Sequence, residues 1–385
     1  MCFKNLFRYV ASQLEISSTG DSRSKAMEGL RGIAVFLVFL VHYSSLVEPW
    51  VPKGSLSWAS MQFLERAGHS GVDLFFLLSG FLIYGSIIRA KSFDVLAYSS
   101  RRLVRIYPTF LVMLATYLLL SWAFPHESKL PDGALEAAFY VIQNALLLPG
   151  IMDIEPIITV AWSLSYEMFF YAAVPLVVLT LRMKAWTPGQ RIAFWLSLAL
   201  LGLMRVDILQ GHVRLLMFVS GIVLYEVIRG YQLRIGARYT CIILLIVAVC
   251  GLRGELALSK SWLYGFLFVA MFVLCLSALS PKNGETKWLA ARPVRWLGNM
   301  SYSYYLIHGL ALKFAFMLLP LVLPKGDPQL ATYYLLMIPM FAFTLPVAFV
   351  LFTLVERPFS IDQSTGRHLS ELLRKRGRAK PNEAS

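Results

Sequence analysis

Apolar residues are grouped into long blocks along the chain, and short polar segments separate these blocks. The blocks are roughly 17–25 residues long, the length with which an α-helix crosses about 30 Å of hydrocarbon. The approximate bounds of the predicted spans are 30–48, 72–88, 107–124, 157–181, 191–206, 211–228, 239–252, 261–279, 297–319 and 331–355. The pattern predicts an all-α integral membrane protein, a polytopic bundle of about ten transmembrane helices.

The composition agrees with lipid as the main solvent. Of the 385 residues, 57% are hydrophobic and only 15% are charged, whereas soluble domains carry about a quarter charged residues. The four cysteines do not have the spacing of a metal site, and three of them fall inside apolar segments. We therefore expect neither a metal site nor a disulfide framework.

The basic residues are placed asymmetrically between the two ends of the predicted spans. With the N-terminus inside, the cytoplasmic segments hold 27 of the 36 Lys and Arg residues, and the opposite loops hold eight. Those segments are 1–31, 89–105, 182–191, 229–238, 281–295 and 356–385. The positive-inside rule therefore predicts that both termini are cytoplasmic. It also explains the net charge of +14 without a nucleic-acid partner.

The segment 133–149 is apolar as well, but counting it as a span would place the basic loop 182–191 outside. We therefore predict a re-entrant or surface-lying helix on the outer side for this segment. On either side of the membrane domain, 28–359, we expect a polar, poorly ordered cytoplasmic leader over 1–27 and a basic cytoplasmic tail over 360–385. The charge of the tail suits attraction to anionic lipid.

Ionisable residues inside spans are costly, so each is a candidate for function. Arg31 and His42 lie eleven residues apart in the first span, which advances a helix by about 16 Å and returns it to within about 20° of the same face. Both side chains are predicted to face one cavity. A neutral imidazole can remove a proton from a hydroxyl group. A core histidine bonded to a backbone carbonyl or to water is an equally compatible interpretation.

Asp73 opens the second span at the outer boundary. It is a candidate for orienting His42 or for binding a substrate hydroxyl, although a helix cap would have the same pattern. Ser79 and Gly80, further along this span, favour close helix packing.

Arg102 and Arg105 are three residues apart at the cytoplasmic end of the third span, so they project together from a helix. Two guanidinium groups suit the phosphates of a nucleotide-bearing ligand. Topology signals alone would also place arginines here.

Two further spans carry polar faces. In the fourth, Ser163 and Glu167 share one helical face, and Trp162 suits an interfacial anchor. In the ninth, Tyr304 and His308 are one turn apart, where they could bind a sugar ring or bond to one another.

Together these segments resemble a membrane-bound acyltransferase family, acyltransferase type three, whose members include O-antigen, exopolysaccharide and Nod-factor O-acetylases. The resemblance runs from about Glu28 to Phe359. Each motif is weak alone, but their number, order and placement are specific. The matching motifs are Arg31 with His42, the Gly-Val-Asp-Leu-Phe-Phe and Ser-Gly-Phe block around Asp73, Arg102 with Arg105, Trp162-Ser163-Leu164 with Glu167, Ser301-Tyr302 with His308, and Glu356-Arg357-Pro358.

The resemblance implies transfer of an acyl group, usually acetyl, from cytoplasmic acyl-coenzyme A to a carbohydrate or lipid-linked glycan at the bacterial inner membrane. It implies a catalytic His42 with Arg31, and binding of the donor by Arg102, Arg105 and Arg31. Glu167 and Asp73 are further catalytic candidates. The acceptor-binding candidates are Trp162, Ser163, Tyr304 and His308. We expect acetyl-coenzyme A as a donor substrate, membrane lipid as a partner and no tightly bound cofactor.

A flippase or exporter of glycolipid or polysaccharide is the alternative, because inward-facing polar residues in ten helices suit transport equally well. The sequence lacks a convincing internal repeat and lacks helices broken at matched positions. These absences and the motif combination favour the transferase.

Overall fold

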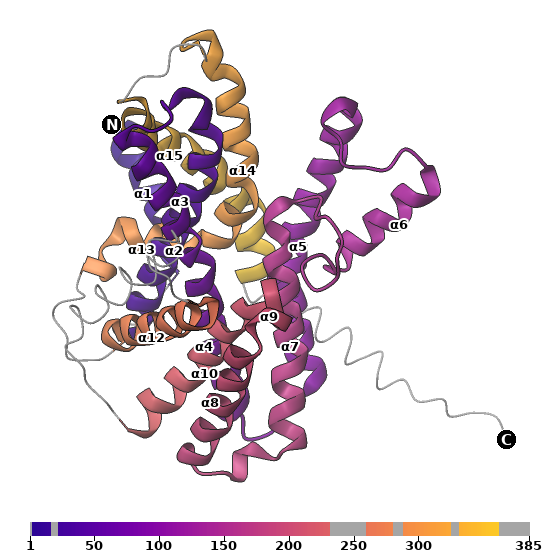
Figure 1. The fold of residues 1–385 in the computed structure, drawn as a ribbon, viewed down its shortest axis with the longest axis vertical. Helices are drawn as coiled ribbons and strands as arrows, with labels where there is room; N and C mark the ends of the chain where they lie inside the picture. Colours follow the sequence, from indigo (N-terminus) through magenta and orange to yellow (C-terminus); the bar gives the residue numbers. More distant parts are fainter. Residues whose placement is uncertain (1, 17–21, 232–258, 280–287, 325–330, 362–385) are drawn as a thin grey trace.

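The computed structural model describes residues 2–16, 22–231, 259–279, 288–324 and 331–361, and this part of the chain is helical without a β-strand (Figure 1). The all-α prediction is confirmed. The helices are α1 (Cys2–Leu14), α2 (Ser22–Val47), α3 (Leu56–Gly68), α4 (Ser70–Ile88), α5 (Val95–Ala123), α6 (Ala134–Ala145), α7 (Trp162–Thr180), α8 (Pro188–Met204), α9 (Val206–Leu209), α10 (Leu216–Gly230), α12 (Lys260–Leu279), α13 (Arg292–Asn299), α14 (Ser301–Leu318) and α15 (Thr332–Leu351). A π-helical segment, Phe352–Ile361, follows α15.

Seven helical segments of the described residues are long and apolar enough to cross a membrane, which makes the chain a multi-pass membrane protein. These segments are Arg23–Trp50, Leu56–Ile88, Val95–Ala123, Thr159–Thr180, Lys260–Leu279, Ser301–Leu321 and Thr332–Ile361. Two other predicted spans correspond to α8 and α10, which have 17 and 15 residues. Their rise of about 25 and 22 Å is less than the hydrocarbon thickness of about 30 Å. The predicted span 239–252 lies outside the described residues, so the count of ten stays a prediction.

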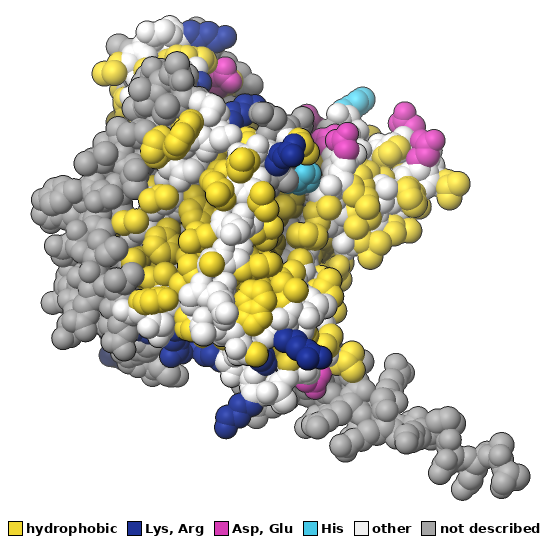
Figure 2. All heavy atoms as spheres, turned by 60° about the horizontal axis from the view of Figure 1, so that its bottom comes forward, with side chains coloured by type: hydrophobic (Ala, Val, Ile, Leu, Met, Phe, Trp, Pro, Cys, Tyr) yellow, Lys and Arg dark blue, Asp and Glu magenta, His cyan; other side chains and the backbone are white. Residues whose placement is uncertain are grey.

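Figure 2 shows the surface that such a protein presents to lipid. Hydrophobic side chains cover the middle of the visible face, and Lys and Arg side chains gather along its lower edge. Exposed apolar side chains occur on several helices, for example Trp122 on α5, Leu200 on α8 and Leu335 on α15, as expected for a surface that faces lipid. Lipid tails replace the core contacts that a soluble protein would need at such positions.

The apolar segment 133–149 forms α6, a helix of 12 residues. A helix of this length rises only about 18 Å, too little to span the membrane. Figure 1 shows α6 on an arm that projects away from the body beside α5. The chain reverses after α6 through two residues with positive φ, Leu147 at 55° and Gly150 at 92°. The geometry agrees with the predicted surface-lying helix rather than with an additional span.

The predicted orientation can be tested with reporter fusions. Because the basic loops are expected inside, fusions at Ser92, Thr187 and Ser385 should report a cytoplasmic location. Fusions at Gly54 and Pro131 should report the opposite side. A cytoplasmic reading at Pro131 would contradict the assignment of α6 to the outer surface, and would require a new register for every later span.

Helices α1 and α3 are among those that occur where the sequence predicted none. The loop before the second predicted span contains α3, whose first turn is capped because Ser55 Oγ accepts a bond from the Trp58 amide at 3.1 Å. The leader over 1–27, expected to be poorly ordered, contains α1. Asn299 Nδ2 donates to the carbonyl oxygen of Leu14 at 2.8 Å, and Arg295 forms an ion pair with Glu15. These bonds hold the end of α1 against α13, which the composition of the leader does not reveal.

Helix α4 lies at the centre of the bundle and packs against α2, α7 and α10. A Cβ atom added to Gly80 would lie 2.1 Å from the carbonyl oxygen of Phe218, and one added to Gly221 would lie 1.9 Å from that of Leu77. The backbones of α4 and α10 therefore touch, as small residues at a membrane helix interface allow. The packing role predicted for Gly80 is confirmed.

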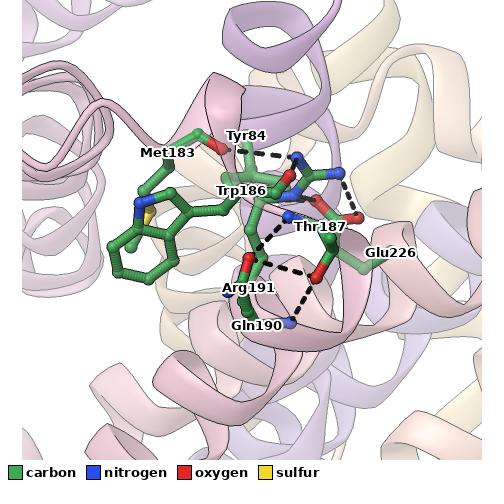
Figure 3. A network of polar contacts seen from close by, with 7 residues as sticks. All are labelled: Tyr84, Met183, Trp186, Thr187, Gln190, Arg191 and Glu226. Carbon is green, nitrogen blue, oxygen red and sulfur yellow. Dashed lines mark hydrogen bonds and ion pairs between the residues drawn. The ribbon is translucent and has the colours of Figure 1, made fainter.

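The buried carboxylate of Glu226 has a structural explanation (Figure 3). Arg191 binds it through two bonds, Nε to Oε1 at 2.6 Å and Nη2 to Oε2 at 3.0 Å, and Tyr84 donates to Oε1 at 2.5 Å. Arg191 Nη1 also donates to the carbonyl oxygens of Trp186 and Met183 at 2.7 and 3.3 Å. A bidentate Arg–carboxylate contact of this kind neutralises the buried charge and also fixes the relative orientation of the two side chains. The cluster joins α8, α10 and α4 to the loop before α8.

Changing Glu226 to Gln should destabilise the protein, because Arg191 would become a buried charge without a counter-ion. Loss of one partner of a buried pair costs about 3–5 kcal/mol. The side chains of Arg191 and Glu226 are only 11% and 2% exposed. The measurement is thermal unfolding in detergent. As a control, Lys313→Gln breaks the exposed ion pair with Glu127 and should cost less than about 1 kcal/mol. Equal losses for the two variants would contradict a structural role for Glu226.

Candidate functional site

A cavity of about 160 Å³ lies among α2, α4, α5, α7 and α14. Five of the residues singled out by the sequence line it together. They are Arg31, Arg102, Arg105, Ser163 and Glu167. These residues come from three different helices, α2, α5 and α7, and are up to 136 positions apart in the chain. Their convergence makes this cavity the candidate active site.

Arg105 is the most firmly fixed of the three arginines. Its Nη1 donates to Oε1 of Glu356 at 2.8 Å, and the Glu356 side chain is fully buried. The other oxygen of Glu356 accepts bonds from the backbone amide and the hydroxyl of Ser303, at 2.9 and 2.6 Å. Glu356 therefore stabilises the first turn of α14 and one guanidinium group of the cavity at the same time.

Arg102 lies one turn before Arg105 on α5 and has a different environment. Its Nη2 donates to Ser86 Oγ at 3.2 Å. Its guanidinium carbon lies over the rings of Tyr98 and Tyr171, 5.2 and 5.1 Å from their centroids. Within the described residues Arg102 has no carboxylate partner, so its charge is available to an anionic ligand.

Glu167, a candidate of the fourth predicted span, lies close to the arginines. It lines the same cavity as Arg102 and Arg105, and it accepts hydrogen bonds from Tyr171 at 2.6 Å and from Ser79 at 3.2 Å. Ser79, predicted to be a packing residue, is therefore a polar cavity residue. Tyr171 was missed, although its position four residues after Glu167 places it on the same helical face.

The charges around the cavity do not cancel. Arg31, Arg102 and Arg105 contribute three positive charges, and the carboxylates near them in the described structure are Glu167 and Glu356. The balance is one net positive charge in a largely buried setting. A charge of this kind is costly unless an anion or water accompanies it. The arrangement suits an anionic ligand held by charge-assisted bonds.

His42 is not among the residues that line this cavity, so its predicted place in one cavity with Arg31 stays a prediction. Its ring meets the ring of His308 at a centroid distance of 4.9 Å. Tyr305 lies between the two regions, because it lines the cavity while its ring is 6.2 Å from His308. A ligand that extends from Arg31 towards His42 would have to pass Tyr305.

The hydroxyl of Tyr305 is tied to the start of α7. It lies 2.7 Å from Ser163 Oγ and 3.0 Å from the carbonyl oxygen of Val160. Trp162 contacts Phe76 edge to face, with ring centroids 6.2 Å apart, and it does not line the cavity. Of this pair of acceptor-binding candidates, Ser163 is at the cavity and Trp162 supports its wall.

Tyr304 is directed away from the cavity. Its hydroxyl lies 2.8 Å from Thr344 Oγ1, its side chain is fully buried, and its ring stacks on His308 with centroids 5.2 Å apart. The structure therefore places Tyr304 as a packing partner of His308 and not as a residue that touches a sugar.

Asp73 pairs with a residue that the sequence did not single out. Its Oδ2 accepts a bond from Arg214 Nη1 at 2.9 Å, and Arg214 also donates to the carbonyl oxygen of His69 at 3.2 Å. The suggestion that Asp73 orients His42 is therefore not supported by a contact. No pattern in the sequence marks Arg214 as the partner of Asp73.

These features define a class of protein, a multi-pass helical membrane protein whose central cavity carries excess positive charge and adjoins a pair of histidines. The chain belongs to the acyltransferase domain family, whose model matches residues 24–354. The resemblance deduced from the motifs is confirmed.

The curated relatives include two bacterial proteins. O-acetyltransferase OatA of Staphylococcus aureus is 28% identical over 318 residues, which cover 73% of this chain and 49% of the relative. Peptidoglycan O-acetyltransferase OatA of Listeria monocytogenes is 25% identical over 325 residues, covering 74% and 48%. The chain thus spans about half the length of these relatives. No solved structure gives a significant match.

Proposed function

We propose that this protein transfers an acetyl group from cytoplasmic acetyl-coenzyme A to a hydroxyl of a cell-envelope carbohydrate at the bacterial inner membrane. The observation that carries the proposal is the excess positive charge of Arg31, Arg102 and Arg105 around one cavity. A phosphate-bearing donor supplies the anion that this cavity lacks. Family membership and the names of the relatives support acyl transfer as the reaction.

Each part of the site has a place in this reaction. Arg102 and Arg105 hold phosphates of the coenzyme, and its arm extends past Arg31 towards Tyr305 and His42. His42 is half-buried and forms no hydrogen bond with a described residue, so its ring nitrogens are free to approach a hydroxyl. Alignment of the thioester with the hydroxyl supplies much of the rate.

The chemical step exchanges one carbon–heteroatom bond for another. The acceptor oxygen attacks the thioester carbonyl carbon, a C–O bond forms, and the C–S bond breaks with its electron pair going to sulfur. His42 takes the hydroxyl proton as the oxygen attacks and returns a proton to the coenzyme thiolate. The products are an O-acetyl ester and free coenzyme A.

The proposal is tested with detergent-purified protein, acetyl-coenzyme A and a set of envelope glycans that includes peptidoglycan fragments. We expect release of thiol that depends on the glycan, with formation of an ester detected by mass spectrometry. A flippase or exporter would bind or move glycan without releasing thiol. Absence of thiol release with every glycan of the set would overturn the proposal.

A further inference from the structure

His308 is held in one tautomer by the backbone of its own helix. Its Nδ1 lies 2.9 Å from the carbonyl oxygens of both Tyr304 and Tyr305. Carbonyl oxygens only accept hydrogen bonds, so Nδ1 carries the hydrogen. In the neutral ring Nε2 is then a lone-pair acceptor. The side chain is fully buried, and Nε2 has no hydrogen-bond partner in the described structure.

A buried acceptor without a donor is costly, so the neighbours of Nε2 are informative. Tyr304 covers one face of the His308 ring, stacked at 11°. The His42 ring meets it edge to face, with centroids 4.9 Å apart and planes at 64°. His42 is half-buried and is not bonded to a described residue, so its ring can rotate while His308 stays fixed. Of the two histidines, the fixed one offers an acceptor and the free one offers a donor.

We propose that His308 is a positioning residue that acts through His42, by accepting a hydrogen bond from one ring nitrogen of His42 and so directing the other nitrogen at the acceptor hydroxyl. This inference rests on the proposed acyl transfer. The proposed role extends the site into α14 through a chain of hydrogen bonds. The chain runs from the acceptor hydroxyl to His42, from His42 to His308, and from His308 to the carbonyl oxygens of Tyr304 and Tyr305. In catalytic triads a third group orients the base in the same way.

The bond would be strongest during the chemical step. When His42 takes the hydroxyl proton it becomes an imidazolium, and its second N–H then donates to the lone pair of His308 as a charge-assisted bond. His308 gains no proton and loses none, because its own N–H stays on the carbonyl oxygens. The positive charge on His42 disappears when the proton passes to the coenzyme thiolate.

Two substitutions at position 308 separate this role from a purely structural one. Asparagine can place its amide nitrogen where Nδ1 lies, so His308→Asn keeps the bonds to the two carbonyl oxygens and removes the acceptor at Nε2. Glutamine can place its amide oxygen near Nε2, so His308→Gln keeps an acceptor there. We expect His308→Gln to retain kcat within about threefold of wild type. His308→Asn should lose about ten- to a hundredfold in kcat, with little change in affinity for acetyl-coenzyme A.

A structural role alone predicts the opposite order, because Asn preserves the bonds that fix the ring in α14. Equal kcat values for the two variants, at any level, or a higher value for His308→Asn would therefore overturn the inference. Failure of the proposed function is distinguishable, since the wild-type protein would then release no thiol with any glycan. The measurement is the steady-state rate of thiol release, with donor affinity determined by calorimetry on the same preparations.

Discussion

Replacement of His42 by alanine should lower kcat for acyl transfer by about two to four orders of magnitude, the usual contribution of a general base. Affinity for acetyl-coenzyme A should change by less than about twofold. The reason lies in the geometry, because His42 is not among the residues that line the cavity of Arg31 and Arg102. An interaction made only in the transition state appears in kcat and not in binding of the donor. The measurements are thiol release and calorimetry on detergent-purified protein.

His126 provides a control for this variant. It is an exposed histidine in the short helix Pro125–Glu127, and His126→Ala should match wild type in both measurements. If His42→Ala keeps more than about a tenth of the wild-type kcat, His42 is not the base. His308 would then be the next candidate, because its Nε2 is a fixed lone pair in the same region.

The sequence predicted the composition of the cavity well. Arg31 and Glu167 were selected because a charge inside an apolar helix is costly, and Arg102 and Arg105 because they project together from one end of a helix. The structure brings all four around one space. The physical reason is that charges in such helices can avoid lipid only by facing one another or a wet cavity. A residue's type and its place in an apolar block therefore carry much of the information about the site.

The sequence did not predict which charges become partners. Helical periodicity gives the face on which Asp73 lies, but its contact with Arg214 depends on the rotation and register between α4 and the segment before α10. Close approach of the two backbones at Gly80 fixes that register. Packing of this kind depends on pairs of residues that are far apart in the chain, and a periodic pattern within one helix does not contain it.

The two arginines of the Arg-x-x-Arg pair should respond differently to substitution, although the sequence treats them alike. Arg102 has a hydroxyl and two aromatic rings as partners, whereas Arg105 neutralises the buried Glu356. Each charge-assisted bond to a phosphate contributes about 1.5–3 kcal/mol, which is roughly ten- to a hundredfold in affinity. Arg102→Ala should weaken binding of acetyl-coenzyme A by about that factor and leave thermal stability nearly unchanged. Arg102→Lys should restore affinity only in part, because an ammonium group cannot form the planar, bidentate contact with phosphate that a guanidinium group forms.

Arg105→Ala should lower stability as well as affinity, because it leaves Glu356 buried without its cation, at a cost of about 3–5 kcal/mol. Adding Glu356→Gln to this variant should restore much of the melting temperature but not the affinity for the donor. Arg101→Ala changes the exposed neighbour of Arg102 and should affect neither measurement. Normal donor affinity in both Arg102→Ala and the double variant would show that the phosphates bind elsewhere. The excess positive charge of the cavity would then need another anion, and the route of the acyl group past Arg31 would have to be abandoned.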